Sequence, residues 1–321
     1  MKNNTQKLDI DLVYLWVDGS DPVWQAKRNA FVENLEENTS INCKGRYADN
    51  DELKYSLRSV EKYAPWIRKI FIVTDDQTPN WLDTANPKIS VVNHLDILPE
   101  KSLPCFNSRV IESYLYKIPN LSEHFLYAND DMFFGAVASP DFFFKSDGFP
   151  IVRLIRKPWG KWHYRAYCLT KILTGKKPGQ YPKTIADASL LVEKNFKKHY
   201  SGIPHHNIDA YRKVDFREAM EVVFRKQAEK SSTHHIRSME DLQRSVILYY
   251  ALATGRGHLK YIKKHESMRI PAQSVDFMKR LIRYQPELFC LNDGQRVNDG
   301  DRERIKPFLE ELFPEKSSFE K

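Results

Sequence analysis

The sequence predicts an α/β fold with a mixed or mostly parallel sheet, a site at the strand ends and a basic helical insert. Four apolar runs rich in strand-forming residues each end in polar or acidic residues, and helical patterns lie between some of them. One of these runs ends in two adjacent acids, at the place where an open α/β sheet binds its ligands. A fifty-residue segment further along holds the excess positive charge.

The first predicted strand covers residues 9–17 and ends in a polar turn that continues to Pro22. We interpret this turn as a nucleotide-binding loop at a strand end, with Trp16, Asp18, Gly19 and Asp21 as its candidate residues. A plain turn would be the better interpretation if this loop were the only one of its kind in the chain.

A helix is predicted to begin at residues 49–52, where capping residues and acids gather, and to end at Pro65. Arg46 and Arg58 lie in or near it as candidate phosphate partners, although each alone is more typical of a surface or ion-pair residue. Strands follow at residues 69–74 and 89–92.

The stretch from His124 to Gly135 is the centre of the predicted site. A short apolar run stops at Asn129, Asp130 and Asp131, and a second one follows to Phe134. Two adjacent carboxylates supply the oxygen ligands that Mg²⁺ or Mn²⁺ takes beside phosphates. A solvated turn explains the same residues about equally well, because Asn and Asp favour turns.

A helix capped by Asn107 and Ser108 leads into this stretch, so its start could face the same crevice. Glu112 lies one turn inside it, where the helix dipole alone would also stabilise a carboxylate.

The segment at residues 151–200 contains twelve Lys or Arg and two acids, against a net charge of +8 for the whole chain. Such a patch attracts phosphates, nucleic acid or an anionic membrane face. Aromatic residues among the basic residues could bind single-stranded nucleic acid. However, no nucleic-acid-binding motif accompanies them, so a nucleic-acid partner is not expected. We predict three parts: an α/β part at 1–145, a basic insert or lid at 146–200, and a C-terminal part at 201–321 that completes the same domain.

Two loops in the C-terminal part carry candidate catalytic groups. His205 and His206 are adjacent and do not share a helical face, so one of them as a general acid or base is a better interpretation than a zinc pair. Arg237 precedes a long apolar helix and could reach a phosphate. Asn292 and Asp293 end another short strand.

The composition narrows the class of protein. The chain has 321 residues, 41% hydrophobic and 29% charged, and no apolar run approaches the length of a membrane helix. The polar N-terminus lacks a signal core, so a cytoplasmic protein is expected. The four cysteines are widely spaced, which argues against zinc and disulfide frameworks: Cys43, Cys105, Cys168 and Cys290. The sequence has neither a P-loop nor a GxGxxG motif, which argues against a kinase or a dinucleotide enzyme.

Four blocks of sequence form one larger pattern: residues 14–22, the stretch from 46 to 131, the two loops at 204–209 and 237–241, and residues 290–293. Together they resemble the Stealth family of sugar-1-phosphate transferases. That family includes bacterial capsular and exopolysaccharide phosphotransferases and the catalytic subunit of the GlcNAc-1-phosphotransferase that tags lysosomal enzymes. The resemblance spans nearly the whole chain, and the basic segment is its least family-like part.

The resemblance implies a Rossmann-like fold of the nucleotide-sugar-transferase type that uses Mg²⁺ or Mn²⁺. It implies that hexose-1-phosphate or N-acetylhexosamine-1-phosphate passes from a nucleotide sugar to a hydroxyl of an oligo- or polysaccharide. The products would be a phosphodiester and a nucleoside monophosphate. A peripheral contact with an anionic membrane is also expected. The alternative is a metal-dependent glycosyltransferase, which would break the sugar–oxygen bond and release a nucleoside diphosphate.

The family's catalytic positions match Glu112, Asp131, Arg237 and one histidine of the third block. The family's histidine usually lies two residues before the proline, where this chain has Gly202. We prefer His206, because it leads into residues 207–209 as the family's histidine does, and His205 stays the alternative.

Overall fold

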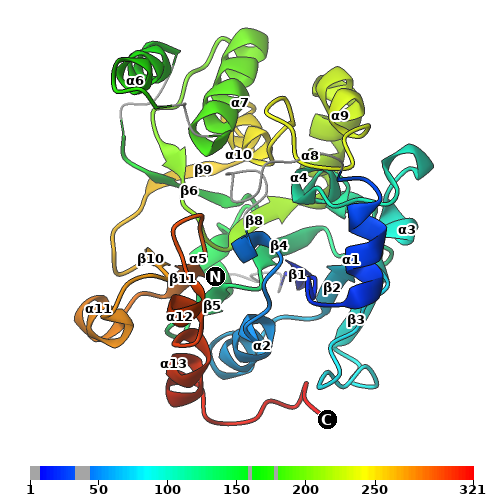
Figure 1. Cartoon of the computed structure of the whole chain (residues 1–321). Helices are drawn as coiled ribbons and strands as arrows, with labels where there is room; N and C mark the ends of the chain where they lie inside the picture. Colours follow the sequence, from blue (N-terminus) through cyan, green and yellow to red (C-terminus); the bar gives the residue numbers. More distant parts are fainter. Residues whose placement is uncertain (1–7, 33–43, 158–160, 177–179) are drawn as a thin grey trace.

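The computed structural model describes residues 8–32, 44–157, 161–176 and 180–321 (Figure 1). Cys43 therefore lies outside the described residues. The strands of the described part form one five-stranded sheet and two three-stranded sheets.

The five-stranded sheet has the order β3-β2-β1-β4-β8. Its parallel strands, in chain order, are β1 (Ile10–Leu15), β2 (Ile70–Thr74), β3 (Ile89–Asn93) and β4 (His124–Asn129). The edge strand β8 (Asp209–Arg212) pairs with β4 in the antiparallel direction. The central strands are almost wholly buried because helices cover both faces. The predicted α/β fold with a mixed sheet is therefore confirmed.

The two smaller sheets have the orders β10-β11-β5 and β7-β6-β9. Their strands are β5 (Met132–Phe134), β6 (Ile151–Ile155), β7 (Ile203–Pro204), β9 (His258–Tyr261), β10 (Ser267–Pro271) and β11 (Leu288–Asn292). β5 follows β4 directly and pairs with β11, with Met132 opposite Cys290. This pairing brings the polar ends of β4 and β11 together although they lie far apart in the sequence.

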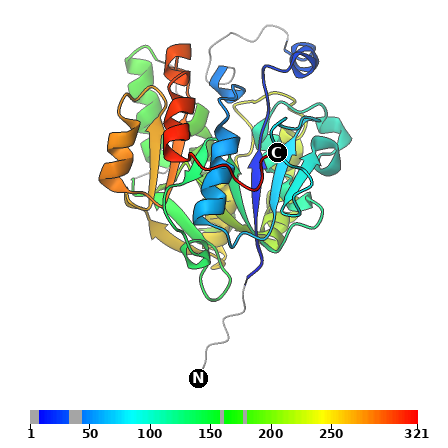
Figure 2. The same ribbon diagram turned by 90° about the horizontal axis from the view of Figure 1, so that it is seen from below.

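Helices cover the central sheet on both sides (Figure 1). On one side lie α7 (Gln180–Phe196), α8 (Lys213–Glu218) and α10 (Ser245–Ala253), and every residue of α10 is buried. On the other side α2 (Glu52–Tyr63) packs Leu53, Leu57 and Val60 into the second core, and Figure 2 shows it in front of the sheet. The remaining α-helices are α1 (Pro22–Asn29), α3 (His94–Ile97), α4 (Ser108–Glu112), α5 (Pro140–Phe143), α6 (Lys161–Leu173), α9 (Arg225–Ser231), α11 (Phe277–Tyr284), α12 (Asp299–Arg302) and α13 (Ile305–Leu312).

The basic segment is only partly helical. It contains β6, which we did not predict from the sequence, before the helices α6 and α7. Arg153 on this strand is buried, with its guanidinium 3.7 Å from the ring centre of Phe142, so its charge does not belong to the surface. None of the helices within the described ranges is both long enough and apolar enough to cross a membrane.

Candidate active site

A cavity of about 400 Å³ opens where β1, β2 and β4 end. Because parallel strands end at the same edge of a sheet, this is the location that the sequence predicts. The four candidate catalytic residues, Glu112, Asp131, His206 and Arg237, all line this cavity. So do Trp16, Asn129, Asp130, His205, Asn292 and Asp293.

The structure contradicts the nucleotide-binding role predicted for Arg58. This side chain lies on α2 and does not line the cavity. Its guanidinium donates two hydrogen bonds of 2.8 Å to the carboxylate of Glu320 and a third to the carbonyl of Phe313. Arg58 therefore fastens the C-terminal segment to α2, and an ion pair explains it better than a phosphate.

Residues 18–22, in the turn after β1, shape the cavity wall without lining it. Asp21 caps α1 by accepting hydrogen bonds from the backbone of Val23 and Trp24. Gly19 donates to the carbonyl of Tyr47, and a Cβ at Gly19 would lie 2.3 Å from that oxygen, so no larger residue fits. Trp24 and Tyr47 do line the cavity, with ring centres 5.1 Å apart.

Asp18 belongs to the same turn and likewise does not line the cavity. Its carboxylate accepts hydrogen bonds from the backbone and hydroxyl of Ser20, and its backbone is held by the side chain of Gln77. Of the predicted nucleotide-binding residues, only Trp16 reaches the cavity. The other residues of this turn position aromatic rings.

Asp131 has one oxygen that is held and one that is not. Oδ2 accepts a hydrogen bond of 3.3 Å from the thiol of Cys290, while Oδ1 is buried and has no hydrogen-bond partner among the described residues. Burial, with the charge of Asp293 as a smaller cause, raises the pKa of Asp131 to about 7. A buried carboxylate with an unpartnered oxygen is suited to a cation, which would supply the missing partner and charge.

A second group of acids lies beside Asp130. Burial raises the pKa of Asp130 well above its ordinary value, and the charges of Glu52, Asp131 and Asp49 raise it further. The pKa of Glu52 is raised to about 8 and that of Asp49 to about 6, in both cases mainly by burial. From the sequence we interpreted Asp49 and Glu52 only as the start of a helix. The run of four polar residues at 49–52, directly before an apolar stripe, was the available signal of a buried acidic cluster.

The possible metal ligands around Asp131 are carboxylate oxygens on one hand and the nitrogen and sulfur atoms of His206 and Cys290 on the other. Ligand atoms of Asp131, His206 and Cys290 all lie within 4.8 Å of one another. Burial raises the pKa of the Cys290 thiol well above its ordinary value, so the thiol is protonated in the metal-free protein and donates a hydrogen bond to Asp131. The carboxylate oxygens of Asp130 and Asp131 fit the hard cations Mg²⁺ and Mn²⁺.

The two histidines have different surroundings. His205 is buried between the hydroxyl of Ser267, 2.8 Å from Nδ1, and the carboxylate of Asp209, 3.0 Å from Nε2, so both ring nitrogens are occupied. A ring nitrogen of His206 lies within 4.8 Å of a carboxylate oxygen of Asp131, and Nε2 of His206 lies 3.5 Å from the amide nitrogen of Asn292. Burial, with Arg269 and Arg244 nearby, lowers the pKa of His206 to about 3, so its ring is neutral at pH 7. This geometry favours His206 over His205 as the proton acceptor.

Glu112 belongs to a buried ionic chain that is centred on Arg244. The guanidinium of Arg244 pairs with Asp209, lies 3.5 Å from Glu112 and donates a hydrogen bond of 2.7 Å to Tyr211. Burial raises the pKa of Glu112, and Arg244 opposes that effect. We did not predict a role for Arg244 from the sequence; a lone cation at the start of an apolar helix was the available signal.

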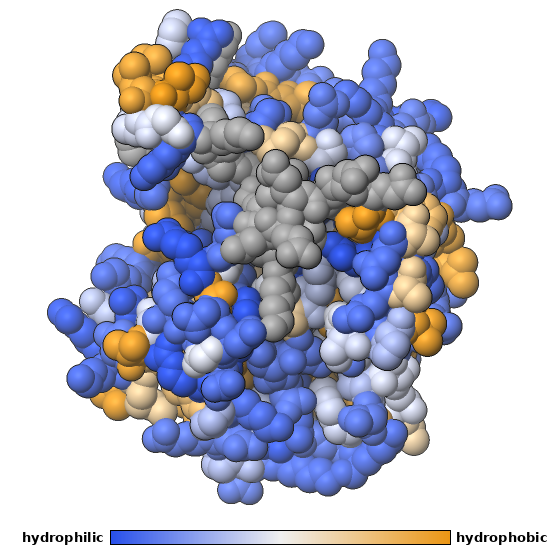
Figure 3. All heavy atoms as spheres, viewed as in Figure 1, coloured by the Kyte–Doolittle hydropathy of each residue, from blue (hydrophilic) through white to orange (hydrophobic). Residues whose placement is uncertain are grey.

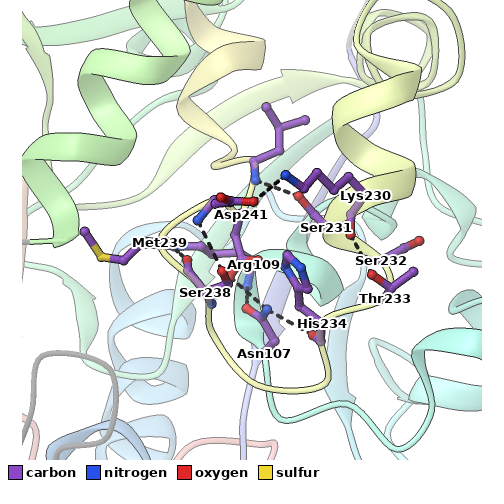
Figure 4. A network of polar contacts seen from close by, with 12 residues as sticks. Asn107, Arg109, Lys230, Ser231, Ser232, Thr233, His234, Ser238, Met239 and Asp241 are labelled. Atoms are coloured by element: carbon purple, nitrogen blue, oxygen red, sulfur yellow. Dashed lines mark hydrogen bonds and ion pairs between the residues drawn. The ribbon is translucent and has the colours of Figure 1, made fainter.

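The loop that carries Arg237 is fixed by a dense polar network (Figure 4). The side-chain amide of Asn107 donates to Asp241 at 2.9 Å and to the carbonyl of His234 at 3.1 Å. The other carboxylate oxygen of Asp241 lies 2.7 Å from Nδ1 of His234. Arg109 adds a hydrogen bond to the carbonyl of Ser238. Arg237 itself donates to the hydroxyl of Ser108 and lines the cavity.

Asp293 is committed to a structural pair. Both of its carboxylate oxygens accept hydrogen bonds from Arg302, at 2.6 and 3.0 Å. A Cβ at Gly45 would lie 2.2 Å from Asp293, so the segment that carries Arg46 and Tyr47 can cross here only with glycine. Asn292 is the better placed of the two residues, since its amide lies beside His206.

Comparisons with known proteins relate the sequence to a protein family. The family models of Stealth protein conserved region 1 and conserved region 2 match residues 8–36 and 46–152. The second region contains Glu112, Asp130 and Asp131. Among solved structures, a galactosyltransferase LgtC in complex with donor and acceptor sugar analogues aligns over 96% of both chains, with a TM-score of 0.47 and 11% identity.

Curated relatives extend the match along the chain. The capsular polysaccharide phosphotransferase SacB of Neisseria meningitidis serogroup A is 34% identical over 98% of this chain and 57% of its own length. An exopolysaccharide phosphotransferase of Streptomyces coelicolor is 33% identical over 97% of this chain and 51% of its own. A capsular polysaccharide phosphotransferase of Actinobacillus suis is 45% identical over 49% of this chain and 43% of its own. The chain thus spans about half the length of the curated relatives that it matches, and it belongs to the Stealth family.

Proposed function

We propose that this chain transfers a hexose-1-phosphate or N-acetylhexosamine-1-phosphate from a nucleotide sugar to a hydroxyl of a capsular or exopolysaccharide acceptor. The product is a sugar–phosphate–sugar diester, and the leaving group is a nucleoside monophosphate. The observation that carries the proposal is the cavity in which Asp131, with its unpartnered oxygen Oδ1, lies close to His206, and which Arg237 also lines.

The reaction needs an oxygen nucleophile and a neutralised phosphate. The acceptor hydroxyl attacks the phosphorus that carries the sugar, and the bond from that phosphorus to the oxygen bridging the two phosphates breaks. The hydroxyl proton passes to the imidazole of His206, which is neutral because burial lowers its pKa. A bound diphosphate would place negative charge opposite Arg269 and Arg244, which raises the pKa of His206 toward the working pH.

Arginines neutralise the phosphates. Arg237 can donate to phosphate oxygens while the network of Asn107 and Asp241 fixes its loop. Asp131 and Asp130 would hold Mg²⁺ or Mn²⁺, which when bound neutralises the charge of the diphosphate. Glu112 pairs with Arg244, so we assign to Glu112 the role of orienting the acceptor in the cavity.

The aromatic wall is our candidate for the nucleobase site. Trp24, Tyr47 and Phe106 line one side of the cavity, with ring centres of Trp24 and Phe106 5.5 Å apart. Flat rings stack on nucleobases with little regard to which base is present. This wall therefore supports a nucleotide donor without selecting its base.

The test is to incubate the protein with a panel of nucleotide sugars and acceptor oligosaccharides and to identify the released nucleotide. We expect nucleoside monophosphate, and a new phosphodiester signal in the phosphorus NMR spectrum of the product. Release of nucleoside diphosphate without a phosphodiester would instead show the alternative, a metal-dependent glycosyltransferase.

A further inference from the structure

Helix α6 exposes an apolar stripe that points away from the protein. Trp162, Ala166, Leu169 and Leu173 recur at the spacing i, i+4, i+7 and i+11, which places them on one helical face. Trp162 is 73% exposed, Leu169 57% and Leu173 76%. Figure 3 shows hydrophobic side chains gathered at the upper left, where α6 lies in Figure 1.

The opposite face of α6 is the one that packs. Tyr164, Tyr167, Cys168 and Lys171 are partly buried, and α6 contacts α7. The apolar stripe is therefore not the edge of the core. An ordinary surface helix carries charged residues at these positions, and contiguous exposed apolar residues are typical of an interaction surface.

Positive charge surrounds the stripe. The sequence has no Asp or Glu between Asp147 and Asp187, while Arg165 and Lys176 are exposed on or just after α6. Ile172, which is 66% exposed, extends the apolar face beside Arg165. An amphipathic helix with Trp and Leu on one face and cations at its margins is the pattern of helices that lie in the headgroup region of an anionic bilayer.

We propose that α6 is a membrane-docking helix that binds an anionic lipid surface through this apolar stripe and its flanking cations. A polyanionic saccharide would contact the cations and could stack on Trp162, but it would gain nothing from the exposed aliphatic side chains of Leu169 and Leu173. A partner helix would also cover the stripe. However, helices that pair with one another usually carry both acidic and basic residues beside their apolar stripes, and α6 carries no acidic residue. The cavity borders α7, through Tyr181, so the docked helix would lie next to the active-site part of the chain.

The test compares three forms of the protein in sedimentation with lipid vesicles. The stripe variant changes Trp162, Leu169 and Leu173 to Ser. The control variant changes Val222, Val275 and Ile282 to Ser, because these side chains are equally exposed, at 71%, 86% and 67%, but lie outside α6. Vesicles are phosphatidylcholine alone or with 30 mol% phosphatidylglycerol.

We expect the wild type and the control variant to bind anionic vesicles, and the stripe variant to bind at least ~30-fold more weakly. Brominated lipids should quench the fluorescence of the wild type more than that of a Trp162→Phe variant. High salt should weaken binding. Equal thermal unfolding of the stripe and control variants would show that both are folded.

Three outcomes would overturn the proposal. The first is no binding of the wild type to either vesicle. The second is undiminished binding by the stripe variant, which would place the lipid contact elsewhere. The third is a wild-type dimer in light scattering that the stripe variant converts to a monomer without lipid, which would show that the stripe is an interface between copies of the chain.

Discussion

Replacing Asp131 with Asn should stabilise the metal-free protein at alkaline pH while it removes activity. The carboxyl has an ordinary pKa of 3.8 and a folded-state pKa of about 7, mainly because it is buried. A pKa that is raised on folding favours the protonated form, so its contribution to stability is present below pH 4 and is lost as the pH rises through about 7. Asn has the same shape and does not ionise.

The magnitude follows from the two pKa values. A change from 3.8 to about 7 corresponds to a loss on the order of 4 kcal/mol between pH 4 and pH 8. For a chain of 321 residues, an unfolding entropy of about 2.1 cal/mol/K per residue converts this into a shift of about 6 °C in Tm. In EDTA, Tm of Asp131→Asn minus Tm of the wild type should therefore rise by about 6 °C over this pH range.

The assay is thermal unfolding by circular dichroism from pH 4 to pH 8, in EDTA and in excess Mg²⁺ or Mn²⁺. Added metal should raise Tm of the wild type more than that of the variant, and more at pH 8 than at pH 5. Activity of the variant should fall by roughly 10²-fold or more. Asp187→Asn, at an exposed carboxylate on α7, is the control. Parallel curves for wild type and Asp131→Asn would refute the reasoning, since they would show that the buried carboxylate is not destabilising.

Three further predictions concern other residues in or beside the cavity. His206→Gln should lower kcat by about 10²-fold with Tm retained, whereas His205→Gln should lower Tm, because His205 joins Ser267 to Asp209 in the core; the reverse pattern would assign the proton to His205. Cys290→Ser should keep most of the activity, whereas Cys290→Ala should lower it about tenfold. The reason is that only a hydrogen-bond donor at this position can hold Oδ2 of Asp131 and leave Oδ1 toward the cavity. Equal activity of the two variants would show that this hydrogen bond does not matter. Arg244→Met should lower the free energy of unfolding in urea by about 3 kcal/mol or more, because it leaves Asp209 and Glu112 without their buried cation, and an unchanged midpoint would contradict that.

The elements that the sequence predicted well are those whose signal is local. The apolar runs at β1, β2, β3 and β4 are long enough, and rich enough in strand formers, to be recognised without knowledge of their partners. β6 is as long as β2, but it was missed because Arg153 interrupts its apolar run inside the basic segment. β8 was missed because its four residues begin and end with charged side chains, and both strands are stabilised by pairing with distant strands.

The site followed the same rule. Asp131, His206 and Arg237 could be predicted as site residues because acids at a strand end and polar residues in loops are visible in the sequence, and the structure places all three around one cavity. Arg58 was misassigned because its partner, Glu320, is 262 residues away and nothing near Arg58 indicates it. Arg244 and Glu52 were overlooked because their importance comes from burial next to other charges, which only the folded chain reveals.

The pairing of β5 with β11 has a consequence for how the chain matures on the ribosome. The backbone carbonyl of Asp131 accepts a hydrogen bond from the amide of Leu291, and its side chain is oriented by Cys290, which is 159 residues further along. The ribosome therefore synthesises the parallel strands of the central sheet long before Cys290 and Leu291, which orient Asp131. A nascent chain in which β11 has not yet left the ribosome would lack the residues that orient Asp131, so the candidate site would be completed in one late step.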